Sequence, residues 1–373
     1  MSRRTKLALA VVALLVLLIG AGVLLVTRQA PAPSTAATGE SITIIDDVGR
    51  TVTLRKPVRR VVVYNRYTTE FIRAVGAMDT VVGADIDSNK DEGYWRTVTK
   101  DMYAGASQSQ PNYEKIVSLQ PDVVFMPRNG VYEETIQKMA PFGIPVVVIT
   151  GWDVLKHEYN VDLLGRIFDK PAEAAKLNAF YRHYRNLLAE RLKGVERKRV
   201  YLEEVGDYKT LLPGSGFHDM VQEGGGLNVF GDVNILNQAS ARGTVQGFTV
   251  DPEEIIARRP DVIIKLEPRS YLPTPRETSV RLLGALAARP GFSQMKAVTD
   301  GEVYHMSYYM SSGASKITGA LLIAKWLYPE RFTDIDPSAV MDEWLETYQH
   351  VPRSKDYWTS LKQLRASGGN AAR

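Results

Sequence analysis

Three short patterns occur twice in this chain, and the second copy of each lies 139 residues after the first. They are a basic residue leading an apolar run, a Glu-x-Ile segment, and a Pro-Asp pair leading another apolar run. The paired positions are Arg60 and Arg199, Glu114 and Glu253, and Pro121 and Pro260. One match can arise by chance, but three at one spacing indicate a duplicated unit rather than a short-period solenoid.

The segment between the two copies has the pattern of a single long helix, from residue 171 to about residue 194. Pro171 suits the first helical turn, and Gly194 suits the end. Between them, apolar residues recur at spacings of three and four. Such a helix would span roughly 36 Å. It could be one more helix of a single domain, but the repeat on either side favours a helix that links two lobes.

The first 40 residues have the pattern of a membrane-targeting segment. Residues 1–6 include the basic residues Arg3, Arg4 and Lys6. Residues 7–26 are an unbroken apolar run long enough to cross a bilayer, and residues 27–40 are rich in Pro, Ala, Ser and Thr. A cleaved signal usually has a shorter core and a nearby small-residue site. Cleavage after Ala37 is the alternative, but the pattern favours a cytoplasmic stub, an uncleaved transmembrane anchor and a flexible linker with the remainder outside the cell membrane.

Charge and cysteine content exclude several classes of function. The chain has 46 basic and 42 acidic residues, and four of the basic residues and no acidic ones fall within residues 1–38. The exported part is therefore neutral, which gives no argument for nucleic-acid binding. The absence of cysteine excludes disulfides, thiolate metal sites, a cysteine nucleophile and a lipid-modified N-terminal cysteine.

Runs of Val and Ile alternate with helical patterns, which predicts an α/β fold with mainly parallel sheets covered on both faces. We expect a β-hairpin at 42–54 and strands at 58–64, 81–83, 122–126, 144–150, 200–203, 262–266 and 302–306. Helices are expected at 68–75, 114–119, 132–139, 219–223, 253–257, 318–327 and 342–349. The predicted organisation is an N-terminal lobe at 41–168, a linking helix at 169–195, a C-terminal lobe at 196–350 and a C-terminal tail at 351–373.

The chain resembles the extracytoplasmic solute-binding proteins of ABC importers for iron chelates and cobalamin. The resemblance extends from about residue 42 to residue 349. It rests on DVGR at 47–50, RVV at 60–62, VGA at 75–77, VVG at 81–83, NYE at 112–114, PDVV at 121–124, GIPV at 143–146, GGGLN at 224–228, Glu253 with PD at 260–261, AV at 297–298 and GEVY at 301–304. Relatives are often anchored by a lipidated cysteine, which this chain lacks.

The resemblance implies two lobes joined by one long rigid helix, with a ligand held between them and little closure on binding. Open α/β sheets bind ligands at the carboxyl ends of their strands. Candidate ligand-binding residues are therefore those that follow the expected strands, with a few on nearby loops. They are Tyr64, Arg66, Tyr67, Trp95, Arg128, Trp152, Lys209, His218, Arg242, Lys265, Arg269, Tyr308 and Tyr309.

Arginines and tyrosines at loop tips suit an anionic, partly aromatic ligand, and a ferric siderophore complex fits best. For any single arginine, a solvated loop charge is an equally good interpretation. A corrinoid, haem or an oxyanion such as molybdate stays open as the ligand. His218 could pack or cap a helix, or contact the ligand.

The sequence gives little support to catalysis or to a resident metal. The five histidines are dispersed without ligand spacing, and there is no phosphate-binding loop or nucleophile elbow. We expect a binding protein without cofactor, metal or enzymatic activity; a chelatase-like enzyme on a related scaffold is the alternative. By resemblance, Glu114 and Glu253 would dock a monomer of this protein onto a permease dimer that works with a cytoplasmic ATPase.

Overall fold

The computed structural model of the chain describes residues 40–86, 91, 93–235, 238–267, 270, 272–353 and 356–366. Residues from Ser41 onward form one compact unit. The expected anchor at 7–26, most of the linker, the end of the expected tail and Arg269 lie outside the described residues. Among the helices that are described, none is both long and apolar enough to cross a membrane.

The first lobe is built on a four-stranded parallel sheet in the order β4-β3-β7-β8. Most positions in these strands are buried, as expected for a sheet with both faces covered. A hairpin precedes the sheet, and a small two-stranded sheet and four helices accompany it. The elements are β1 (Ser41–Ile45), β2 (Thr51–Arg55), β3 (Val61–Val63), α2 (Arg66–Ala74), β4 (Val81–Ala84), β5 (Gly105–Ser107), β6 (Gln110–Pro111), α3 (Tyr113–Leu119), β7 (Val123–Met126), α4 (Tyr132–Met139), β8 (Val146–Val148) and α5 (His157–Ile167).

The second lobe has a mixed sheet in the order β12-β10-β9-β13-β14-β15, and β11 also pairs with β9. The pairings β11–β9, β9–β13 and β13–β14 are parallel, whereas β10, β12 and β15 pair antiparallel with their neighbours. The elements are β9 (Lys198–Glu203), β10 (Lys209–Leu211), α7 (Gly216–Glu223), β11 (Gly226–Asn228), β12 (Gln246–Thr249), α8 (Pro252–Ala257), β13 (Val262–Leu266), α9 (Arg276–Ala287), α10 (Lys296–Thr299), β14 (Val303–Met306), α11 (Tyr308–Ser311), α12 (Lys316–Leu327), α13 (Pro337–Glu343), the π-helical turn η8 (Trp344–Gln349), β15 (Trp358–Ser360) and α14 (Leu361–Ala366).

The duplication is confirmed at the level of individual hydrogen bonds. Asp122 precedes β7, and its Oδ2 accepts from the backbone N–H of Arg60 at 2.8 Å. Asp261 precedes β13, and its Oδ2 accepts from the N–H of Arg199 at the same distance. The strand registers agree as well, because Val61 pairs with Val123 and Val200 pairs with Val262. Each second-lobe position is 139 residues after its counterpart.

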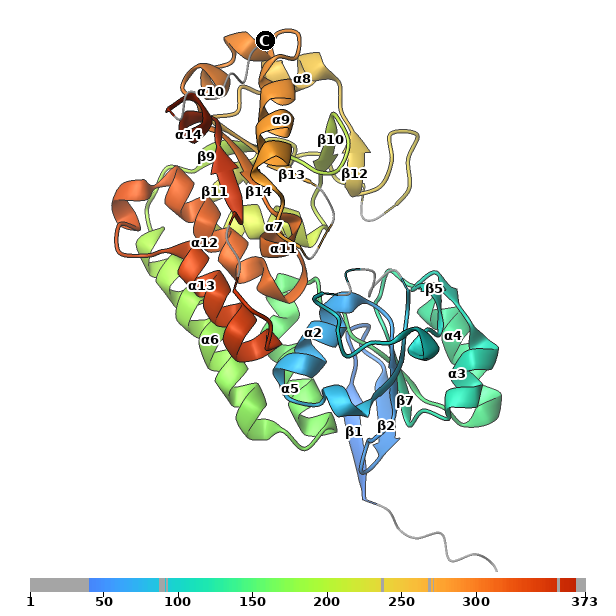
Figure 1. Cartoon of the computed structure of the whole chain (residues 1–373). Helices are drawn as coiled ribbons and strands as arrows, with labels where there is room; N and C mark the ends of the chain where they lie inside the picture. The colour runs from blue at the N-terminus through green and yellow to red at the C-terminus, as the bar shows by residue number, and fades with distance from the viewer. Residues whose placement is uncertain are drawn as a thin grey trace, which may run out of the picture. The chain divides into compact units, whose positions relative to one another are not determined.

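Helix α6 (Pro171–Arg191) joins the two lobes, as predicted, and Figure 1 shows it in green running from beside α5 toward α12. It ends three residues before Gly194, which follows in a left-handed conformation with φ of 73°. Part of its buried face is covered by aromatic side chains of the second lobe. Phe180 packs against Trp344 and Tyr348 of η8, with ring centroids 6.3 and 5.1 Å apart. The middle of the linking helix therefore packs against η8 of the second lobe.

The two lobes also meet through a buried polar network around α2. The side chain of Gln349 from η8 accepts from Arg73 Nε at 2.9 Å and donates to the backbone oxygen of Glu70 at 3.1 Å. The hydroxyl of Tyr94 donates to Glu70 Oε1 at 2.6 Å. Burial raises the pKa of Glu70 to about 7, although the Tyr94 hydrogen bond and Arg73 act against it. These contacts hold the lobes together independently of α6.

The prediction of a C-terminal tail at 351–373 is wrong for residues 356–366. β15 pairs antiparallel with β14, and Leu361 and Leu364 of α14 are buried. Residues 356–366 therefore complete the second lobe. A three-residue strand shows no periodicity from which it could be recognised, which explains the error.

Candidate functional site

A cavity of about 820 Å³ lies between the lobes, at the carboxyl ends of the parallel strands. The first lobe contributes segments that follow β3, β4, β7 and β8, and the second contributes the start of α7, the region before β12 and residues after β14. Ligands bind at this edge in open α/β sheets. The cavity is lined by Val48, Asn65, Arg66, Tyr67, Asp85, Ser107, Gln108, Ser109, Arg128, Asn129, Tyr132, Trp152, Gly214, Ser215, Gly216, Phe217, Thr244, Val245, Gln246, Tyr308 and Lys316.

Arg66 lies between aromatic rings of both lobes. Asn65 caps α2 with a φ of 88°, and its side chain accepts from the N–H of Tyr67 at 3.1 Å, which places Arg66 at the first helical position. The Arg66 guanidinium lies 5.3 Å from the ring centroid of Tyr67 and 5.5 Å from that of Tyr308. The hydroxyls of these two tyrosines are 3.2 Å apart across the lobes. This is a cationic and aromatic surface of the kind that accepts a flat anion.

Arg128 forms a second cationic and aromatic pair on the first lobe. It follows β7, and its guanidinium lies 4.4 Å from the ring centroid of Trp152, which follows β8. Its Nη1 donates to Asp153 Oδ2 at 2.7 Å, and the side chain is 29% exposed. A guanidinium carries five N–H donors in a fixed fork, so this ion pair orients Arg128 while engaging only its Nη1.

Lys316 is the third cationic side chain of the lining, and the sequence did not point to it. It begins α12 and is 1% exposed, and its Nζ donates to the backbone oxygen of Trp152 at 2.8 Å across the lobes. Burial lowers the pKa of Lys316 to about 7, with Asp219, Asp153 and Glu70 acting in the opposite direction. A lysine within a run of small residues could have indicated this position. The sequence prediction missed it because it placed the start of the helix at residue 318, two residues after Lys316.

Five of the expected binding residues are brought together at the cavity: Arg66, Tyr67, Arg128, Trp152 and Tyr308. Three aromatic candidates lie in the core instead. Tyr64 is fully buried and donates to the backbone oxygen of Ala104, while Trp95 and Tyr309 are 1% and 2% exposed. Trp95 packs edge-on to Tyr94, as does Tyr309 from the other lobe. Position after a strand did not reveal that these rings face inward.

The remaining second-lobe candidates do not line the cavity. Lys265 is buried and paired with Glu203 at 2.8 Å, so it neutralises a core carboxylate. Arg242 is exposed and pairs with Glu254 at 3.3 Å. Lys209 is also exposed. His218 accepts from the Asn228 side chain through Nδ1 at 3.2 Å, in keeping with burial lowering its pKa.

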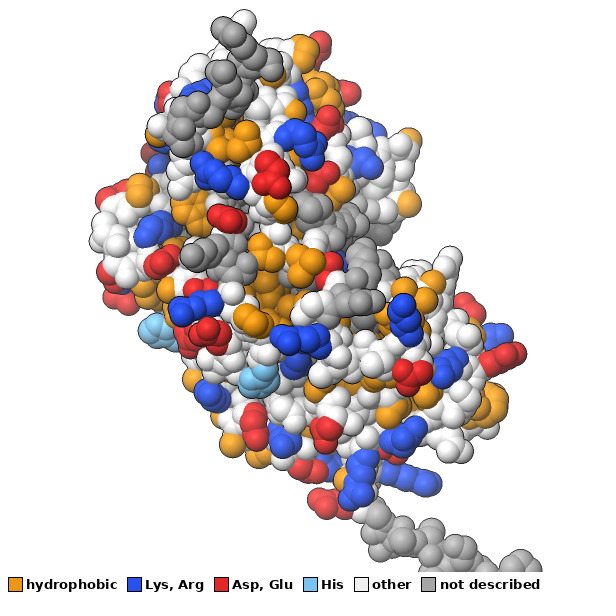
Figure 2. All heavy atoms as spheres, in the orientation of Figure 1, with side chains coloured by type: hydrophobic (Ala, Val, Ile, Leu, Met, Phe, Trp, Pro, Cys, Tyr) orange, Lys and Arg blue, Asp and Glu red, His pale blue; other side chains and the backbone are white. Residues whose placement is uncertain are grey.

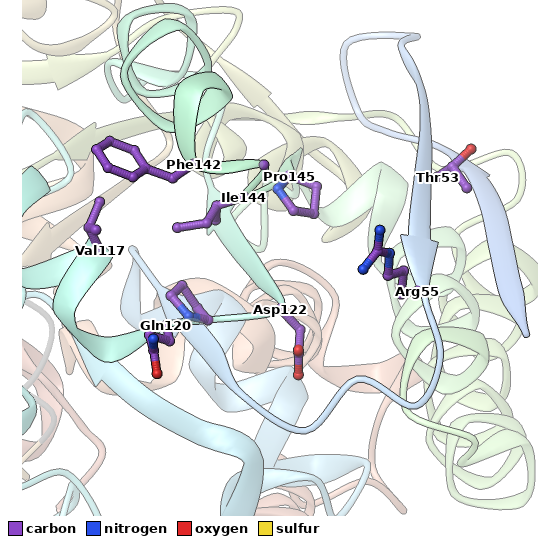
Figure 3. Close-up of a pocket in the computed structure, with 10 residues that line it drawn as sticks. Thr53, Arg55, Val117, Gln120, Asp122, Phe142, Ile144 and Pro145 are labelled. Atoms are coloured by element: carbon purple, nitrogen blue, oxygen red, sulfur yellow. The ribbon is translucent and has the colours of Figure 1, made fainter. Parts of the chain in front are cut away.

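Two further cavities lie at the opposite edges of the sheets. One, of about 710 Å³, is formed by Thr53, Arg55, Val117, Gln120, Pro121, Asp122, Phe142, Gly143, Ile144 and Pro145, at the amino ends of β7 and β8 (Figure 3). The other, of about 650 Å³, includes Asp261 and Glu302, before β13 and β14. Asp122 is already engaged by the backbone of Arg59 and Arg60. Neither cavity joins both lobes, so the interlobe cavity is the candidate binding site.

The described surface shows no large charged patch on the face in Figure 2 and no cluster of metal-binding side chains among the described residues. On the face shown in Figure 2, basic and acidic side chains are interspersed without a large area of one sign. Within the described residues, no group of three His, Cys, Asp or Glu side chains could hold a metal ion. Glu114 on α3 and Glu253 on α8 are both exposed, each in the first turn of its helix.

The comparison with known families decides the class of protein. The sequence model of the periplasmic binding protein family matches residues 61–309, which covers both lobes and α6. This chain is a periplasmic binding protein. The match confirms the family resemblance found in the sequence and agrees with a cavity formed between two duplicated lobes.

Relatives of this periplasmic binding protein are named for different ligands. The molybdate-binding protein MolA of Haemophilus influenzae is 25% identical, over 84% of this chain and 92% of its own length. The vitamin B12-binding protein of Yersinia pestis is 26% identical, over 55% of this chain and 68% of its own length.

Among solved structures, the TroA-like periplasmic binding protein FepB of Veillonella parvula superposes with a TM-score of 0.70 at 22% identity, covering 85% of this chain and 99% of its own. CeuE of Helicobacter pylori, solved as a nickel–histidine complex, gives 0.64 at 18% identity, covering 84% and 96%. These structures establish the two-lobed α/β fold of this periplasmic binding protein.

Proposed function

We propose that this protein is the extracytoplasmic solute-binding component of an ABC importer, and that it binds an anionic ferric chelate of the siderophore type. The observation that carries the proposal is the interlobe cavity, where Arg66 and Arg128 each lie against aromatic rings. Cations beside aromatic faces suit a ligand that is both negatively charged and partly aromatic. Delivery to a permease dimer is supported by the family and by MolA, which is described as the cognate binding protein of an ABC transporter.

The size of the cavity favours a chelate over a bare oxyanion. Pockets for ligands of several hundred daltons typically measure about 300–1,000 Å³, and this one measures about 820 Å³. Molybdate would fill a small part of that space. Molybdate, corrinoid and haem are kept as alternatives because relatives are named for molybdate and vitamin B12, and a similar structure from Pseudomonas aeruginosa is named for haem.

Native mass spectrometry of the purified protein tests the ligand class. The panel is a ferric tris-catecholate, a ferric tris-hydroxamate, cobalamin, haem and molybdate. We expect retention of a ferric chelate, with the anionic catecholate complex preferred over the neutral hydroxamate complex. Retention of cobalamin, haem or molybdate alone would replace the ferric-chelate assignment with the corresponding alternative.

Replacing Arg66 or Arg128 with Ala should weaken binding of the anionic chelate by about 1.5–3 kcal/mol, as for loss of a charged hydrogen bond. This corresponds to roughly 10- to 150-fold in Kd. Both side chains lie at the cavity, so folding should be retained. Titration calorimetry measures the change, with Arg242→Ala as the matched control because Arg242 is exposed and does not line the cavity. Unchanged affinity in both cavity variants would show that the ligand binds elsewhere.

The apolar run at residues 7–26 supports a membrane anchor with the lobes outside the cell membrane. If the run is retained, the mature protein should begin near Met1 and fractionate with membranes until the linker is cut. Intact-mass measurement of protein purified from membranes checks this. A mature chain that begins near Thr38 would instead indicate a cleaved signal and a free extracytoplasmic protein.

A further inference from the structure

The innermost cationic group of the cavity is Lys316, and its position is built by both lobes. Its amino group lies beside Gly216, where a Cβ would come within 2.7 Å of Nζ and 2.3 Å of the Trp152 backbone oxygen. Its Nζ also lies 4.6 Å from the ring centroid of Phe217. Only glycine at position 216 lets the amino group of Lys316 come this close to the backbone of α7. The amino group therefore lies where α7 borders the cavity.

The hydrogen bonding of Lys316 is incomplete if the group is charged. An ammonium has three N–H donors. Within the described residues, Lys316 makes one hydrogen bond, to the Trp152 backbone oxygen, and no ion pair within 4.0 Å. A buried charge without a close counter-ion is costly, so the amino group of Lys316 loses its proton more readily than an exposed lysine when the cavity is empty. An anion entering the cavity would supply the missing acceptor and counter-ion.

We propose that Lys316 contacts the anionic ligand and that ligand binding places a proton on its amino group, so that affinity is coupled to pH. This inference rests on the proposed function, because it requires an anion in the interlobe cavity. Above pH 7, one proton moves from solvent to Nζ as one anion binds, and this proton returns to solvent when the anion leaves.

The charged and titratable groups around Lys316 determine how the coupling is measured. Arg66, Tyr67 and Glu70 face it from α2, Arg128 follows β7, Asp153 and His157 follow β8, and Asp219 and Tyr308 come from the second lobe. Glu70 titrates in the same range, since burial raises its pKa to about 7. Glu70 loses a proton as pH rises and would also disfavour an anion, so a Glu70→Gln variant separates the two contributions.

The sign of the pH dependence follows from the two protonation states. The pKa of Lys316 in the empty cavity is lowered to about 7 by burial, and a bound anion raises it toward its usual range. Affinity for an anion of fixed charge should therefore be highest below pH 7 and fall as pH rises. By linkage, the decline approaches about tenfold per pH unit between pH 7 and pH 9.

Titration calorimetry in two buffers of different ionisation enthalpy counts the protons directly, without a variant. Molybdate and the ferric tris-catecholate serve as probes, because both keep essentially the same charge between pH 6 and pH 9. We expect uptake of close to one proton per ligand at pH 8 and close to none at pH 6. Lys316→Met should bind roughly 10- to 100-fold more weakly at pH 6 and lose most of the pH dependence. Lys316→Arg should bind independently of pH, since arginine stays charged.

Lys209→Met is the matched control, because Lys209 is exposed and does not line the cavity; its pH profile should equal that of the natural protein. Anion binding without proton uptake at pH 8, together with unchanged affinity in Lys316→Met, would overturn the inference while leaving the proposed function intact. If the unaltered protein binds neither anionic probe at any pH, the assignment of an anionic ligand fails and the inference fails with it.

Discussion

Reversing two charges, with Glu114→Arg and Glu253→Arg combined, should abolish ligand uptake while leaving ligand affinity within about twofold. The two carboxylates are exposed and occupy equivalent positions in the duplicated lobes. We propose that they insert into arginine pockets on the two permease subunits. A contact on each lobe would align the cavity with the translocation path, which one contact cannot do. Neither carboxylate lines the cavity, and exposed charges at an interface mainly govern association with the partner, so ligand affinity should change little.

The measurement is uptake of labelled chelate by cells that carry the double variant, beside calorimetry of the purified protein. A carboxylate in a first helical turn also stabilises its helix, and that simpler role predicts a small loss of stability with normal uptake. Glu190→Arg combined with Glu330→Arg is the matched control, since both are exposed glutamates at positions the repeat does not relate. Full uptake by the Glu114 and Glu253 variant, or a parallel loss of ligand binding, would rule out docking.

Glu203→Leu should destabilise the protein by about 3 kcal/mol, the lower end for breaking a buried ion pair. Lys265 and Arg289 would lose the buried counter-ion that they share and keep only the more exposed carboxylates of Glu267 and Asp207. Glu203 is fully buried at the end of β9. It accepts from Lys265 Nζ at 2.8 Å and from Arg289 at 2.7 and 2.9 Å. Burial alone would raise the pKa of Glu203, but Arg289 and Lys265 outweigh it and hold the pKa below its usual value. Stability from this carboxylate is therefore complete above its unfolded pKa and is lost as pH falls through the lower folded value.

Urea unfolding followed by circular dichroism checks the size of the effect. The triple variant Glu203→Leu, Lys265→Met and Arg289→Leu should recover most of the lost stability, since apolar groups can replace a buried ionic cluster. Asp300→Ala, which breaks an exposed ion pair with Lys296, should leave the unfolding midpoint unchanged. A midpoint for Glu203→Leu equal to that of the unaltered protein would mean that water reaches this cluster.

The fold could be predicted to a large extent because its strongest signals are local or repeated. Buried Val and Ile runs specify the parallel strands, and β13 and α4 begin and end where expected. The constant spacing of 139 residues related the two lobes. Short antiparallel strands such as β10, β12 and β15 could not be predicted, since three or four residues show no period and their pairing is set by distant neighbours.

The candidate site was only partly predictable, for a different reason. The order of strands identifies the edge of the sheet, but it does not say which side chains at that edge face the cavity. Lys265 and Arg289 both pair with Glu203 in the core, and these three residues come from distant parts of the chain. Lys316 is far in sequence from the first-lobe loops and reaches the cavity through a contact with Trp152. Such partners follow from tertiary packing.

The position of η8 and β15 near the end of the chain has a consequence for the order of synthesis. Gln349 completes the polar network around α2, and Trp344 and Tyr348 cover the apolar face of α6. A ribosome that has released the first lobe has therefore not yet released the residues that seal it. Domains generally fold as their residues emerge, but here the contacts of α2 and α6 with η8 cannot form until η8 has been synthesised. We therefore expect the first lobe to be incompletely packed until that point, which would suit a chain that crosses a membrane before it folds.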